Sequence, residues 1–185
     1  MLSKARSNVI VKTTQRIIHH ERGSGLVELA IVAPLLVLMF IATADVGAVL
    51  TAYITLTNAS REGARLAARG NVFVPAQVLQ VITQQSRNVD LDERASVFLT
   101  MVEVQGGSLS MDTQTLCDHA SGASSRAGQL VAHYTEYTDG PNSSYLRKEK
   151  FAIVEIFYGH NSITGFIPGV LPLYAYTIMP VSAPS

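Results

Sequence analysis

Four residues of the chain have side chains whose chemistry could support nucleophilic catalysis or metal binding: Cys117, Asp118, His119 and His133. A cysteine nucleophile needs a histidine base within hydrogen-bond reach. Cys117 and His119 lie in a polar stretch with no strand–turn–helix pattern around it, and Cys117 is the only cysteine. The chain also lacks zinc-ligand spacing, a phosphate-binding loop and a nucleophile elbow. We therefore expect no enzyme activity, no metal and no cofactor.

A different kind of chemistry is indicated by Glu28, a carboxylate near the start of an apolar stretch. Between Leu26 and Leu56 the only charged residues are Glu28 and Asp45. About twenty such residues span a bilayer as a helix. A carboxylate in hydrocarbon costs about 2.5–3.5 kcal/mol at the bilayer centre, so such residues usually have a functional reason.

The spacing between Gly23 and Glu28 suggests that reason. Gly23 follows a leader with five basic residues and one acidic residue, and it precedes Glu28 by five positions. This pattern resembles a type IV prepilin signal, in which a peptidase cuts after the glycine and a glutamate becomes the fifth mature residue. Ser24 would then carry a new amine. A carboxylate such as Glu28 on a neighbouring helix would compensate the charge of that amine and register the two subunits.

The charge distribution predicts the orientation in the membrane. The formal net charge is zero, but the leader is basic and the part after Gly23 has nine basic and thirteen acidic residues. A basic head suits the cytoplasmic face of a membrane. It suits nucleic acid less well, because it is short and has no interleaved aromatic residue. We expect a single-pass membrane protein with its N-terminus on the cytoplasmic side and its C-terminal domain on the opposite side.

The apolar run continues into a longer helical pattern, and the domain boundaries follow from it. We predict a leader over residues 1–23, one helix over 24–70 with its transmembrane part at about 26–48, and a small domain over 71–185. A helix from about residue 26 to 69 is about 65 Å long, roughly twice the hydrocarbon thickness. Pro34 is expected to kink it, and Gly70 is placed as its C-terminal cap.

The rest of the chain reads as an α+β domain with an antiparallel sheet of about four strands packed on a short helix. The helix is predicted at 74–89, and the strands at 95–105, 129–137, 150–159 and 173–181. Polar loops are expected at 106–128 and 138–145. In the third strand, Ile153, Glu155 and Phe157 share one face.

Two stripes repeat every four residues along the predicted helix. One consists of the small residues Ala59, Gly63 and Ala67, and the other of the arginines Arg61, Arg65 and Arg69. The small residues allow close approach either of a partner helix or of the chain's own domain. The arginines form either a solvated face or a docking surface for an acidic partner. Asp45 either ends the hydrocarbon span or pairs with a partner helix.

Several of these motifs together resemble the TadE-like pseudopilin family of the tight-adherence (Flp) pilus system. They are "VELA" at Glu28, the following Pro34, "DVG" at Asp45 and "NASREGARLAARG" from Asn58. "VEIFYG" and "YAYTIMPV" are similar to the paired terminal strands of that family. One departure is Asp45, where glutamate is expected more often. The resemblance implies a non-enzymatic minor pilin, cut by a prepilin peptidase and involved in pilus assembly, adhesion and biofilm formation.

The resemblance also implies the partners. They are the prepilin peptidase, the major Flp pilin, other minor pilins and the inner-membrane assembly platform, with the protein either staying in the membrane or entering an extracellular pilus. Two alternatives remain open. One is an uncut, single-pass anchored binding module. The other is a secreted domain released after Ala44, because Ala42 and Ala44 form an A-x-A-like pattern.

Overall fold

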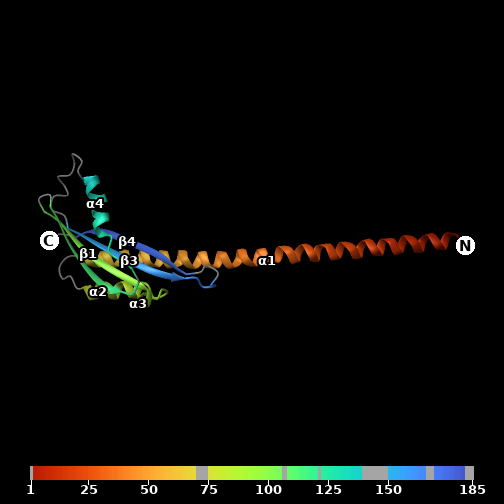
Figure 1. Ribbon diagram of the computed structural model, residues 1–185, viewed down its shortest axis with the longest axis horizontal. Coiled ribbons are helices and arrows are strands. Elements are labelled where there is room, and N and C mark those ends of the chain that lie inside the picture. The colour runs from red at the N-terminus through yellow and green to blue at the C-terminus, as the bar shows by residue number, and fades with distance from the viewer. Residues whose placement is uncertain are drawn as a thin grey trace. The chain divides into compact units, whose positions relative to one another are not determined.

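The computed structural model describes residues 2–69, 75–105, 108–120, 122–138, 150–165 and 169–181. A long helix, α1 (Leu2–Ala67), is followed by a four-stranded antiparallel sheet and short helices, as Figure 1 shows. The strands are β1 (Ala95–Gln105), β2 (Ser108–Asp118), β3 (Lys150–Asn161) and β4 (Val170–Pro180). The short helices are α2 (Pro75–Gln85), α3 (Leu91–Arg94) and α4 (Ala127–Thr138). The predicted α+β class is confirmed.

The chain forms two compact units, Met1–Asp45 and Val46–Ser185. Helix α1 begins at Leu2 rather than near Leu26, so its backbone is already helical through the basic residues before Gly23, and it continues through Pro34. After Ala67, two further amides still bond to carbonyls of the last turn. Gly70, the expected cap, lies outside the described residues. The second unit contains the last turns of α1 together with the sheet and the short helices.

The sheet has the strand order β2-β1-β3-β4, and every neighbouring pair is antiparallel. The register places Leu99 of β1 opposite Val154 of β3, and Glu155 of β3 opposite Tyr176 of β4. Strands predicted at 95–105, 150–159 and 173–181 are confirmed by β1, β3 and β4. The helix predicted at 74–89 is α2, which ends four residues earlier.

Two sequence predictions are wrong. Residues 129–137 are helical rather than extended, because Ala127 and Val131, one turn apart, are buried together against Phe151. Residues 108–118, expected in a loop, form the edge strand β2, which is held by its ladder to β1 and leaves Leu109 and Met111 exposed. The loop predicted at 138–145 lies outside the described residues beyond Thr138.

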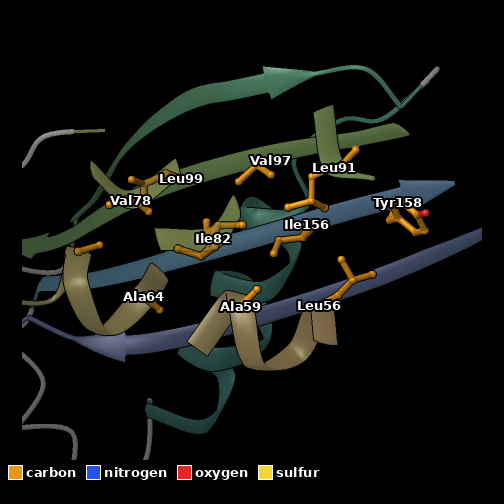
Figure 2. Packing of buried hydrophobic residues seen from close by; sticks show 14 of the residues in the cluster. Leu56, Ala59, Ala64, Val78, Ile82, Leu91, Val97, Leu99, Ile156 and Tyr158 are labelled. Carbon is orange, nitrogen blue, oxygen red and sulfur yellow. The ribbon is translucent and has the colours of Figure 1, made fainter. Parts of the chain in front are cut away.

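Both faces of the sheet carry apolar clusters, because neighbouring residues of a strand point to opposite faces. One cluster joins Val97, Leu99 and Ile156 to residues of α1 and α2, among them Leu56 and Ile82, as Figure 2 shows. The other joins β1 and β3 to α4. Strand β3 is therefore covered on both sides, which explains the nearly continuous apolar run in its sequence.

The last turns of α1 are part of this domain. Leu56 and Ala59 are fully buried in the first cluster. Ser60 is also buried, and its hydroxyl lies 2.8 Å from the hydroxyl of Thr177 in β4. These contacts fix the C-terminal turns of α1, from Leu56 onward, to the sheet by packing and by a hydrogen bond.

Candidate assembly segment and Glu155 site

The N-terminal part of α1 is the described segment that is long and apolar enough to cross a membrane. Within Gly25–Ala67 an 18-residue window has a mean hydropathy of 2.5, and none of that window is buried. Large apolar side chains are widely exposed along it, for example Ile31 at 72% and Phe40 at 77%. So large an exposed apolar surface needs lipid or other helices to cover it. The segment therefore fits a single-pass membrane anchor.

The three residues of the predicted processing signal lie within helix α1. Gly23 and Ser24 have helical backbones, and the side chain of Glu28 is exposed. A carboxylate on an exposed face of an apolar helix is free to meet a neighbouring chain.

Asp45 differs from Glu28 because it is buried. Its exposed fraction is 1%, although it lies in the same apolar helix, and it takes part in an interaction within the chain. A buried carboxylate needs hydrogen-bond or charge partners to be tolerated. Asp45 is also the last residue of the first compact unit.

The small residues of α1 face the chain's own domain. Ala59 and Ala67 belong to the core cluster. At Gly63 an added Cβ would lie 2.9 Å from two side-chain carbons of Ile82 and 3.5 Å from Val78. Glycine at this position therefore lets α1 and α2 approach more closely than a larger residue would allow.

Arg61 and Arg65 are exposed on the same helix, and Arg69 is exposed two residues beyond its end. The side chain of Arg65 forms an ion pair with Glu62, at 2.8 Å between Nη2 and Oε2, and Nε of Arg65 donates a hydrogen bond to the same oxygen. A surface pair of this kind contributes little stability. The stripe lies on the solvent side of the domain, where a partner can reach it.

The comparison with known protein families bears directly on this helix. The family model described as TadE-like protein matches residues 23–65. The match therefore covers the apolar stretch of α1 and most of the turns that pack on the sheet. No curated protein and no solved structure matches the chain. The TadE-like match begins at Gly23 and includes Ala59 and Gly63 of the small-residue stripe.

The TadE-like match associates the chain with the Tad pilus machinery. This family is a structural component of the pilus and not a known enzyme family. The match ends at residue 65, so the sheet, α2 and α4 lie beyond the TadE-like segment.

Two of the four residues that could have supported catalysis, Cys117 and Asp118, make side-chain contacts in the domain that follows the TadE-like segment. The thiol of Cys117 lies 3.6 Å from the carbonyl oxygen of Ala95, and burial raises its pKa, which makes it a poorer nucleophile. The hydroxyl of Ser96 donates to Asp118 at 2.7 Å. His119 is exposed, and the side chain of His133 lies outside the described part. Among the described residues, no three His, Cys, Asp or Glu side chains are grouped to hold a metal ion.

The same domain contains a buried carboxylate, Glu155, at the centre of β3 and with no exposed surface. It accepts hydrogen bonds from the hydroxyl of Ser125, from the backbone amide of Arg126 at 2.8 Å and from the hydroxyl of Tyr174 at 2.8 Å. Arg126 directly precedes α4, so Glu155 also lies at the positive end of that helix. The carboxylate therefore ties the start of α4 to two strands.

Two aromatic side chains lie against the guanidinium of Arg126. The guanidinium carbon of Arg126 lies 5.0 Å from the ring centre of Tyr174 and 5.5 Å from that of Phe157, which are cation–π distances. Burial, followed by the hydrogen bond to Glu155, raises the pKa of Tyr174 above its usual range. We name Glu155, Ser125, Arg126, Phe157 and Tyr174 the Glu155 site.

The Glu155 site was not predicted from the sequence. It placed Glu155 on one face with Ile153 and Phe157, but did not connect it to Arg126 or Tyr174. The available signal was a single acidic residue inside the apolar strand "FAIVEIFYG", since a charge at such a position needs partners. Its partners come from a loop 29 and 30 positions earlier and from a strand 19 positions later.

Proposed function

We propose that this protein is a minor pilin or pseudopilin of a tight-adherence pilus, cut by a prepilin peptidase after Gly23 and anchored in the bacterial inner membrane. The supporting observation is that the TadE-like match starts at Gly23, two residues before the exposed apolar stretch of α1 that begins at Gly25. The N-terminus faces the cytoplasm, and the sheet domain faces the periplasm. Its partners are the peptidase, the major pilin, other minor pilins and the assembly platform, and its roles are pilus assembly, adhesion and biofilm formation.

The proposed mechanism is assembly through helix exchange. The mature α1 leaves the bilayer by replacing lipid contacts with contacts to helices of neighbouring subunits, which cover the apolar side chains between Leu26 and Phe40. Glu28 of one subunit then compensates the new amine of Ser24 in the next. The domain stays attached throughout, because the C-terminal turns of α1, from Leu56 to Ala67, are packed into its core.

The test is the intact mass and N-terminal sequence of the protein purified from native membranes, with and without the prepilin peptidase of the host. Ser24 at the terminus, and its loss when the peptidase is absent, is the expected result. Met1 at the terminus in both strains would contradict the proposal and indicate an uncut anchor.

A second function has one observation in its favour. A cut after Ala44 would release the chain from Asp45, and the second compact unit begins at Val46. The secreted product would keep the turns of α1 that complete its core. This alternative divides the TadE-like match at residues 23–65, and it predicts Asp45 as the N-terminus in the same sequencing experiment.

A further inference from the structure

A cavity of about 640 Å³ lies at the end of the sheet where β1 and β4 begin and β2 and β3 end. Its described walls come from α3, from the segment after β2, from the residues before α4, and from the ends of β3 and β4. The volume is within the range of about 300–1,000 Å³ that is usual for small-molecule sites. The cavity lies wholly within the second compact unit and outside the TadE-like match.

The lining combines positive charge with apolar surface. Arg94, Arg126 and His119 line the cavity, and Glu93 is the carboxylate among its described lining residues. Phe157, Tyr174 and Leu173 contribute ring and aliphatic surface. Two permanent cations against one carboxylate favour an anionic ligand, and the apolar wall favours a ligand with an apolar body.

Arg126 is held in the cavity wall by contacts of both its backbone and its side chain. Its backbone amide donates to the buried Glu155, and its guanidinium lies over the rings of Phe157 and Tyr174. Within the described ranges the guanidinium has no ion-pair partner. A guanidinium stacked by its face keeps its N–H edge available, and that edge matches a carboxylate with two parallel hydrogen bonds.

We propose that this cavity binds a small organic carboxylate with an apolar body, and that Arg126 binds the carboxylate group. A singly charged ligand fits better than a dianionic phosphate, because Glu93 and the buried Glu155 offset part of the positive charge of the arginines. The Glu155 site is then explained as a support: a buried carboxylate costs desolvation energy, and here it holds the binding arginine in place. The proposal does not depend on cleavage at Gly23.

The experiment compares two ligands that differ only in charge. The full-length protein in detergent micelles is titrated by calorimetry with N-acetyl-L-phenylalanine and with its primary amide. The acid is expected to bind at least about tenfold more tightly than the amide, since a charged hydrogen-bonded contact contributes about 1.5–3 kcal/mol. The Arg126→Gln variant should bind the acid at least about tenfold more weakly than the wild type does. Arg87→Gln, an exposed arginine outside this cavity, should bind the acid as the wild type does.

A second variant separates loss of binding from loss of folding. Val170 lines the cavity, is 63% exposed and does not belong to the Glu155 site, so the Val170→Glu variant should fold. Its added negative charge should lower the affinity for the acid more than the affinity for the amide. Equal affinity for acid and amide, no binding of the acid at millimolar concentration, or wild-type affinity in Arg126→Gln would overturn the proposal. Inorganic phosphate competing more strongly than the acid would overturn the assignment to carboxylates.

Discussion

A buried carboxylate is tolerated only while its oxygens keep their hydrogen-bond donors. In Glu155→Gln one of the two acceptor oxygens becomes an NH2 group, which faces donors from Ser125, Arg126 or Tyr174. We expect the free energy of unfolding to fall by about 1–3 kcal/mol, the usual cost of leaving a buried polar group unpaired. Denaturant unfolding of the purified protein in detergent measures this change.

The matched control is Glu62→Gln. Glu62 has the same side chain, but it forms an exposed pair with Arg65 one turn away on α1. Its loss should change the unfolding free energy by less than about 0.5 kcal/mol. If the two variants were equally stable, the Glu155 site would not stabilise the domain.

Tyr174 makes a second prediction at the level of single residues. Its pKa is raised in the folded chain by burial and by Glu155, whereas the unfolded chain titrates near the ordinary value of about 10. Above about pH 10 the folded chain therefore binds more protons than the unfolded chain, and the free energy of unfolding falls as the pH rises. Tyr174→Phe removes this dependence.

Unfolding curves at a series of alkaline pH values test whether the free energy of unfolding falls as the pH rises. The wild type should be the more stable protein at neutral pH, because Tyr174 donates a hydrogen bond to Glu155. The difference between wild type and Tyr174→Phe should narrow above about pH 10. A constant difference over this range would show that the pKa of Tyr174 is the same in both states.

Among the elements, the contact between α1 and α2 depends on Gly63. A leucine at this position would meet the side chain of Ile82, which an added Cβ already approaches to 2.9 Å. Gly63→Leu should therefore lower the free energy of unfolding by about 1–3 kcal/mol through overpacking. This outcome is also measured by denaturant unfolding.

A double-mutant cycle identifies the contact responsible. Ile82→Ala alone should destabilise the core by about 2–5 kcal/mol, because Ile82 is fully buried. In the double variant the leucine fills the space left by Ile82, so the combined loss should be smaller than the sum of the two single losses. Simple additivity would mean that Gly63 and Ile82 do not interact.

For the whole molecule, Glu28 separates processing from assembly. Under the proposed function, Glu28→Ala should still be cut after Gly23 but should assemble poorly, because the amine of Ser24 loses its counter-charge. Mass spectrometry detects the cleavage, and electron microscopy of sheared pili measures the assembly. Glu28→Asp keeps the charge on a shorter side chain and should retain part of the assembly. Normal pili from Glu28→Ala would count against this role.

Local patterns in the sequence determined a large part of this molecule. The apolar run after Gly25 predicts a membrane-length helix by its length alone, and β1 and β3 follow from runs rich in β-formers. The TadE-like match likewise lies in one continuous stretch, 23–65, which makes it readable from the residues. Such features depend on neighbours along the chain.

Tertiary structure decided what depends on distant partners. Residues 129–137 have a composition that suits a strand, and they became part of helix α4 because Val131 packs on β1 and β3. Strand β2 is held mainly by its ladder to β1, and only its last residues, among them Leu116 and Cys117, pack against the core. Gly63 was assigned to the chain's own domain only when α2 lay against it. The partners of Glu155 come from two other segments, and hydrophobic periodicity carries no information about which segment a buried charge will meet.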